Sequence, residues 1–460
     1  MFWRKPEFEI KALSPGGKPD GASAVPAMEG RPFAESRAVE TPKIADERVA
    51  FIVIHGMGQQ VEYETLGQLG DLMADEEQKK LGEYAAPINV HVVRAKITND
   101  PSDSPLSRAE LTVKRVREGV EKQIDVHVYE GYWAPLTEGK ISFLETVSFL
   151  FAAAWNGIKS SVRRSAFKRW MFGGFQDLPI KKKTLPLLIA LTIVLIIAFL
   201  PFGLAYLFWD KLANKSFHLN VIGGHPYWSG VLLVLLAIYC WLIYYVMVEY
   251  VGDVVIYVSS YKVSRFEEVR GQIQDAVFKV VRQVYSARDE DDDLLPLYNR
   301  VVIVGHSLGT VIAYDMLNAA ISWDLAEQNN KMDVVGRTSA LITFGSPLDK
   351  TAFLFRTQVS GPKFLREALA AQRQPLILDY KDFRPKDTFE WTNIYSRMDI
   401  VSGCLLYYDT PGDSEPSKDP KDPRKPVNNL IDWGAWFPLY AHVQYWGDQR
   451  LRDELYRAIR

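Results

Sequence analysis

The sequence has little of several residue types by which function is often recognised. It contains two cysteines, Cys240 and Cys404, in 460 residues, which excludes a disulfide framework and favours a reducing, cytoplasmic environment. Its formal net charge of −2 argues against nucleic acid as the main partner. Cysteine and histidine clusters with metal-ligand spacing are missing, as are a Gly-Lys-Ser/Thr phosphate loop and a G-x-G-x-x-G turn. We therefore expect neither a metal ion nor a cofactor.

The most informative stretch lies at residues 301–317. Residues 301–304 are apolar and β-branched, which predicts a buried strand, and the run at 311–317 begins a helix. Between them, residues 305–309 read Gly-His-Ser-Leu-Gly. A sharp strand-to-helix turn of this kind raises a serine hydroxyl out of a sheet, and it requires small residues on either side. The pattern predicts that Ser307 is a nucleophile and that Gly305 and Gly309 permit the turn.

A base and an acid are predicted from chain order. This turn resembles the one that carries the serine in α/β-hydrolases, and in that arrangement the acid follows the serine in the chain and the histidine comes last. Of the seven histidines, only His442 lies beyond Ser307, so we predict that it is the base. Asp399 follows an expected strand at 391–396 and Asp349 follows one at 339–344. Either carboxylate could orient the imidazole; we favour Asp399 and keep Asp349 as the alternative.

An early apolar strand at 49–54 is followed by His-Gly-Met-Gly at 55–58. With these motifs the chain resembles the α/β-hydrolase superfamily, specifically the serine esterases and lipases, from about residue 49 to 460 with one long insertion. It departs from that pattern near His442, where no clear β-branched strand precedes the histidine, so the last strand is expected to be short or replaced.

The resemblance implies cleavage of carboxylic esters through an acyl-enzyme intermediate. It places an oxyanion hole at the backbone amides of Met57 and Leu308, and we expect His55 to pack or hydrogen-bond beneath that loop. Two alternatives keep the same fold: a thioesterase or acyltransferase with the same triad, and a catalytically silent membrane scaffold. The supporting residues of the predicted site are His55, Gly56, Gly58, Gly305, His306 and Gly309.

The insertion contains two long runs without charge, 25 residues at 185–209 and 18 residues at 231–248. Because a helix needs about 20 apolar residues to cross a bilayer, both runs are predicted transmembrane helices, with a kink at Pro201 in the first. Buried core helices and a lid that dips into one leaflet are the alternatives. The expected partners are therefore a lipid bilayer and a small-molecule or lipid ester substrate.

Basic residues around the two runs predict their orientation. Residues 159–183 contain eight lysines and arginines, whereas the loop at 210–230 contains two. Positive charge stays on the cytoplasmic side, so we expect an integral membrane protein whose catalytic domain faces the cytoplasm, in the cytoplasmic membrane if the source is bacterial. The amphipathic segment at 141–158 either lies in the headgroup region or packs on the sheet.

The expected organisation is a flexible arm at 1–46, hydrolase parts at 47–140 and 261–460, and a membrane-associated insertion at 141–260. The expected fold is α/β, a mainly parallel α/β-hydrolase sheet covered by helices on both faces, with an inserted two-helix transmembrane hairpin. The element order is strand 49–54, helix 61–81, strand 88–97, helix 107–122, strand 124–129, then helix 262–286, strand 300–304, helix 308–322, strand 339–344, helix 362–372, strand 391–396 and helix 447–459.

Overall fold

The computed structural model describes residues 47–74, 90–95, 106–117, 120–162, 184–207, 226–258, 264–289, 295–327, 332–351, 389–405, 427–434 and 440–459. The chain divides into two compact units, Met1–Ile44 and Ala45–Arg460, and every described residue belongs to the second. The arm predicted at 1–46 and the helix predicted at 362–372 lie outside the described residues.

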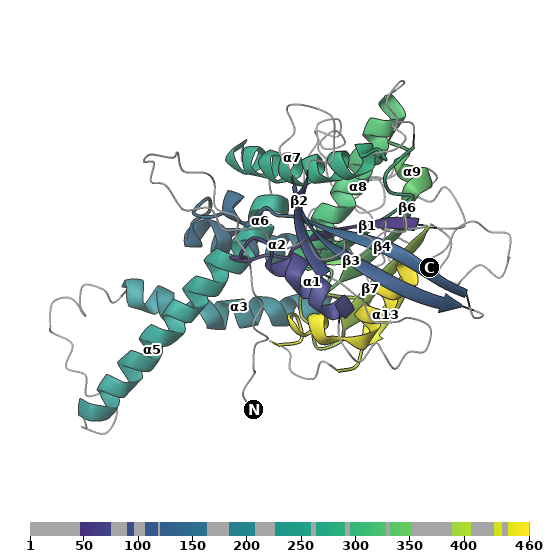
Figure 1. Ribbon diagram of the computed structural model, residues 1–460. Coiled ribbons are helices and arrows are strands. Elements are labelled where there is room, and N and C mark those ends of the chain that lie inside the picture. The colour runs from purple at the N-terminus through teal and green to yellow at the C-terminus, as the bar shows by residue number, and fades with distance from the viewer. Residues whose placement is uncertain are drawn as a thin grey trace, which may run out of the picture. The chain divides into compact units, whose positions relative to one another are not determined.

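An eight-stranded mixed sheet forms the centre of this unit, in the order β2-β3-β4-β1-β5-β6-β7-β8 (Figure 1). From β4 to β8 all neighbours are parallel, whereas β3 runs antiparallel to β2 and to β4. The predicted α/β class is confirmed. The strands are β1 (Glu47–Ile54), β2 (Val90–Ala95), β3 (Leu106–Arg117), β4 (Val120–Gly131), β5 (Arg300–His306), β6 (Thr338–Phe344), β7 (Glu390–Ser396) and β8 (Asn428–Asp432).

Helices cover both faces of the sheet because side chains alternate along each strand. In β1, Ala50 and Ile52 join one buried cluster with α7 (Ser264–Ser286) and α8 (Leu308–Ala326). Phe51 and Val53 join a second cluster with α1 (Glu64–Ala74) and α13 (Gln449–Ala458). The shorter helices are η2 (Ala134–Leu136), α9 (Val334–Arg337) and η5 (Gln444–Gly447).

The helix predicted at 107–122 is wrong, because residues 107–117 belong to β3 and residues 120–122 to the start of β4. Their apolar residues recur every second position: Ala109, Leu111 and Val113 are buried, whereas Arg108 and Glu110 lie on the opposite face and are less buried. A period of two is that of a strand with one buried face. The many charged residues of the segment conceal this alternation.

The insertion contains α2 (Phe143–Val162), α3 (Thr184–Leu207), α5 (Pro226–Val246), a π-helical segment η4 (Met247–Val251) and α6 (Gly252–Val258). Among the described residues one helix, Val234–Val258, is long and apolar enough to cross a membrane, and the apolar stretch found in α3, Thr192–Gly203, is shorter. Of the predicted two-helix transmembrane hairpin, the described residues therefore contain one helix that could span a membrane and a second apolar helix beside it.

Aromatic side chains pack the insertion helices together. The ring of Phe143 in α2 lies 5.2 Å from that of Phe202 in α3 and 5.5 Å from that of Tyr244 in α5, centroid to centroid. The hydroxyl of Tyr239 donates to the carbonyl oxygen of Ala198 at 3.1 Å, which joins α5 to α3. Helix α2 thus packs against the apolar helices, while its Trp155 is exposed.

Candidate active site

The strand order brings four distant loops to one edge of the sheet. Strands β1 and β5 are parallel neighbours in a register that pairs Ile54 with Gly305, so the loop after β1 lies beside the turn after β5. Strands β6, β7 and β8 follow in the same direction. Open α/β sheets bind ligands at the carboxyl ends of their parallel strands, where the strand order reverses.

Ser307 lies on a strained turn between β5 and α8, with φ of 52° and ψ of −127°. The two flanking glycines are required by close backbone contacts. A Cβ on Gly305 would lie 2.7 Å from Cα of Thr310, and one on Gly309 would lie 2.3 Å from the carbonyl oxygens of Ile54 and His55. The turn therefore has the geometry predicted for it, and it holds Ser307 in a conformation that few L-residues adopt.

The three residues predicted as a triad form a continuous hydrogen-bonded chain. Nε2 of His442 lies 2.7 Å from Oγ of Ser307, and Nδ1 of His442 lies 2.8 Å from Oδ2 of Asp399. The alternative acid, Asp349, lies in the helical turn after β6 and is not the partner of Nδ1. With Nδ1 donating to the carboxylate, Nε2 of a neutral imidazole is left to accept the serine proton.

Asp399 is held by further donors that the sequence pattern does not mark. The amide of Val401 donates to Oδ1 at 2.8 Å, and the hydroxyl of Tyr445 donates to Oδ2 at 2.9 Å. Burial alone would raise the pKa of Asp399, but hydrogen bonds from His442, Ser402 and Val401 hold it well below its ordinary value. The acid is therefore ionised throughout the physiological range.

The loop after β1 approaches the nucleophile closely. A Cβ on Gly56 would lie 2.8 Å from Cβ of Ser307, so only glycine allows this approach. Met57 follows in the same loop, and Leu308 is the first residue of α8, where helix amides have no partner within the helix. Among the described residues, no hydrogen-bond acceptor is found for the amide of Met57 or of Leu308. Met57 and Leu308 thus stay the predicted oxyanion donors.

His55 joins this loop by hydrogen bonds to the segment that follows β4. Its Nδ1–H donates to the carbonyl oxygen of Gly56 at 2.8 Å, and its Nε2 accepts the amide of Trp133 at 3.0 Å. The rings of His55 and Trp133 stack with their centroids 4.7 Å apart. Burial lowers the pKa of His55 to about 4, so the ring is neutral at pH 7. With both nitrogens engaged, it supports the loop and has no free position for proton transfer.

Two further side chains hold the loops that carry the predicted base and acid. Nε2–H of His306 donates to the carbonyl oxygen of His442 at 3.1 Å. Nζ of Lys350 donates to the carbonyl oxygens of Ile400 and Ser402 at 2.6 and 2.7 Å, on either side of Val401. Sequence reasoning missed Lys350, Tyr445 and Trp133, because their roles depend on contacts between segments far apart in the chain.

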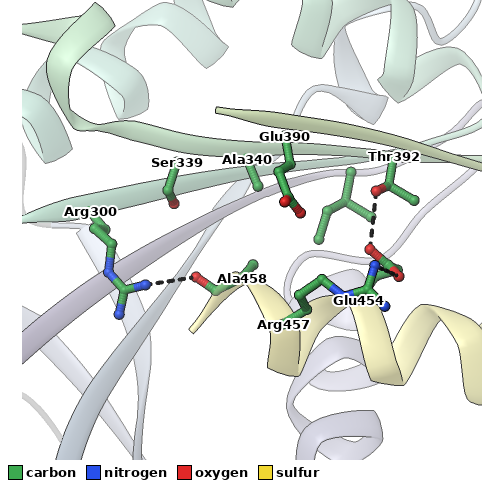
Figure 2. A pocket seen from close by; sticks show the side chains of 9 residues that line it. Arg300, Ser339, Ala340, Glu390, Thr392, Glu454, Arg457 and Ala458 are labelled. Atoms are coloured by element: carbon green, nitrogen blue, oxygen red, sulfur yellow. Dashed lines mark hydrogen bonds and ion pairs between the residues drawn. The ribbon is translucent and has the colours of Figure 1, made fainter. Parts of the chain in front are cut away.

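A cavity of about 270 Å³ lies at the opposite edge of the sheet, where β5, β6 and β7 begin against α13 (Figure 2). Of its charged side chains, Arg457 and Glu454 pair with each other, whereas Arg300 pairs with Glu47 outside the lining. Arg457 binds Glu454 at 2.7 Å, Thr392 donates to Glu454 at 3.0 Å, and Arg300 binds Glu47 at 2.5 Å. The cavity includes no triad residue. Among the described residues, no group of three or more His, Cys, Asp or Glu side chains is placed to hold a metal ion.

Comparison with known proteins gives no information on function, so a functional conclusion depends on the site. No protein-family model matches the chain, and no curated protein matches its sequence.

Proposed function

We propose that the protein is a serine hydrolase of the α/β-hydrolase type, anchored to a membrane, that cleaves carboxylic esters of a lipid or another amphiphile. The observation that carries this proposal is the chain of hydrogen bonds from Ser307 through His442 to Asp399. It is built on a positive-φ turn at the carboxyl edge of an α/β sheet. That combination suits acyl transfer to a serine hydroxyl.

In the proposed reaction Oγ of Ser307 attacks the ester carbonyl while Nε2 of His442 takes the serine proton. The amides of Met57 and Leu308 stabilise the negative oxygen of the tetrahedral intermediate, each by about 3 kcal/mol. His442 then gives its proton to the leaving alcohol, and an acyl-enzyme remains. Water attacks the acyl-enzyme by the same steps, which releases the carboxylic acid and restores Ser307. Asp399 stays ionised and stabilises the imidazolium.

The apolar helices support the membrane part of the proposal. In α5, Val234, Leu235 and Trp241 are 57–64% exposed, and a soluble surface rarely leaves such a row of apolar side chains uncovered. We propose that α3 and α5 form a hairpin in the bilayer, with the catalytic domain on the cytoplasmic side. Transfer of an acyl chain from bilayer to water costs about 0.8 kcal/mol per CH₂, so a site beside the membrane spares a lipid substrate much of this cost.

Labelling with a fluorophosphonate probe tests the chemistry. We expect the wild-type protein to be labelled and the Ser307→Ala variant to be unlabelled. Ser339→Ala, at the opposite edge of the sheet, is the matched control and should be labelled like the wild type. A folded wild-type protein that resists labelling would contradict the proposal and favour a scaffold with a hydrolase-like fold. Product analysis with an added alcohol then separates hydrolysis from acyl transfer, and thioester substrates test for a thioesterase.

A further inference from the structure

The candidate membrane-spanning helix ends directly against the predicted oxyanion loop. Exposed apolar residues of α5 continue through the π-helical segment Met247–Val251 into α6, where Val255 and Ile256 are fully buried in the domain core. Figure 1 shows α5 and α6 as successive parts of one helical stretch. Single π-helical turns inside α-helices are frequent at functional sites.

A carboxylate at this junction holds the main chain of the oxyanion loop. Oδ2 of Asp253, a residue only 6% exposed, accepts the amide of Gly58 at 2.8 Å. Hydrogen bonds to an ionised acceptor are stronger than those between neutral groups. One turn earlier, Glu249 accepts a hydrogen bond from the side chain of Gln59 at 3.0 Å, in an exposed position. The first contact fixes the backbone, and the second involves side chains alone.

Gly58 also lies close to the π-helical segment. Its φ of +98° is unfavourable for residues with a side chain, and a Cβ there would lie 2.9 Å from Cε1 of Tyr250. Gly58 thus has two neighbours on this helical stretch, the ring of Tyr250 and the carboxylate of Asp253. The peptide that joins Met57 to Gly58 is planar, so a fixed Gly58 amide also restricts the rotation of Met57.

We propose that Asp253 is a positioning residue for the oxyanion hole, and that through Asp253 the membrane helix sets the orientation of the Met57 amide. His55 holds the loop before Met57 through the Gly56 carbonyl, and Asp253 holds it after Met57 through the Gly58 amide. A shift of the apolar helix relative to the sheet is transmitted to this second attachment. The inference depends on the proposed function, because it assigns a role within the same site.

Loss of this contact has a specific kinetic consequence. The Met57 amide interacts with charge that develops in the transition state, so its misalignment lowers kcat and has little effect on substrate binding. The full-length protein in detergent, with a short water-soluble ester, removes lipid access as a variable. We expect kcat to fall by about 10²-fold in Asp253→Ala, with KM within about twofold of wild type.

Two further variants calibrate this result. Asp253→Asn keeps a weaker, neutral acceptor and should lose about tenfold in kcat. Glu249→Ala removes the exposed carboxylate on the same helical segment and should change kcat by less than about fivefold. If Asp253→Ala fails to fold, as judged by its melting transition, Asp253→Asn provides the test: unchanged kcat in Asp253→Asn would overturn the inference. A change confined to KM would overturn it as well.

Hydrogen exchange of the peptide that covers residues 55–60 provides a second readout that needs no turnover. Exchange should be faster in Asp253→Ala than in the wild type or in Glu249→Ala, because the Gly58 amide has lost its acceptor. A wild-type protein without labelling or ester turnover would overturn the proposed function, whereas faster exchange would still support the attachment itself. An active wild type with unchanged exchange and kcat in Asp253→Ala would overturn the inference alone.

Discussion

The side chain of His306 donates a hydrogen bond from Nε2 to the backbone carbonyl of His442 at 3.1 Å, and the two imidazole rings stack at 5.3 Å. The residue before the predicted nucleophile therefore holds the loop that carries the predicted base. Ser307 lies on the turn after β5. The hydrogen bond from His306 therefore ties the position of His442 to that same turn.

Replacement of His306 by phenylalanine tests this contact. The ring stacking on Phe344, at 4.9 Å in the native protein, is retained, while the hydrogen bond to His442 is lost. We expect kcat for a soluble ester to fall by about tenfold, the effect of one net hydrogen bond. Burial lowers the pKa of His306 to about 3, so the ring is neutral from pH 5 to 9. The ratio of variant to wild-type activity should be constant over that range, and a ratio that varies with pH would contradict this account.

The choice of acid is tested by two matched amide substitutions. Asp399→Asn removes the carboxylate that accepts from Nδ1 of His442, so the ring can adopt the wrong tautomer. We expect a loss on the order of 10⁴-fold in kcat. Asp349→Asn should lose less than about fivefold, because Asp349 does not accept from Nδ1. The opposite ranking in steady-state kinetics would assign the acid to Asp349.

Tyr445 should contribute to stability as well as to catalysis. Its hydroxyl donates to Asp399 and accepts the amide of Ser396 at 2.9 Å. Tyr445→Phe leaves that buried amide unpaired, which should lower the free energy of unfolding by about 1–3 kcal/mol. It also removes one donor from the acid, so kcat should fall by about tenfold. Denaturant unfolding and kinetics measure the two effects separately, and unchanged stability would show that water replaces the hydroxyl.

Glu130 should make stability depend on pH. Its Oε2 accepts the amide of Tyr63 at 2.6 Å, yet burial raises the pKa of Glu130 from 4.5 to about 7. Between these values the folded state binds more protons than the unfolded state, so this group reduces stability as pH rises. The full shift corresponds to about 3 kcal/mol above pH 7. The melting temperature of Glu130→Gln minus that of wild type should increase from pH 5 to pH 8. A difference that stays constant would contradict the raised pKa.

Membrane topology is testable by cysteine labelling in a variant that lacks Cys240 and Cys404. With the proposed hairpin, Ser216→Cys lies on the far side of the membrane and Ser160→Cys on the cytoplasmic side. An impermeant maleimide should label Ser216→Cys in intact cells and Ser160→Cys only after lysis. Protection of both positions until lysis would indicate a hairpin that enters one leaflet without crossing.

Much of the local structure could be predicted from short stretches of sequence. Four β-branched residues, two glycines and an apolar run predict the strand, turn and helix around Ser307, because each conformation depends on residues within a few positions. The same reasoning failed at β3, where charged residues on the less buried face concealed the alternation of Ala109, Leu111 and Val113. Propensity and charge are weak guides where burial decides the structure.

The sequence by itself determined the α/β class and the turn at Ser307, and it singled out His442 as the predicted base. It left Asp399 and Asp349 as alternative acids, and only the tertiary structure joined Asp399 to His442. It also gave no sign that Asp253 contacts Gly58, which lies 195 positions away, or that Tyr445 supports the acid. Such contacts depend on strand order and on the packing of the insertion against the sheet, which are properties of the whole fold.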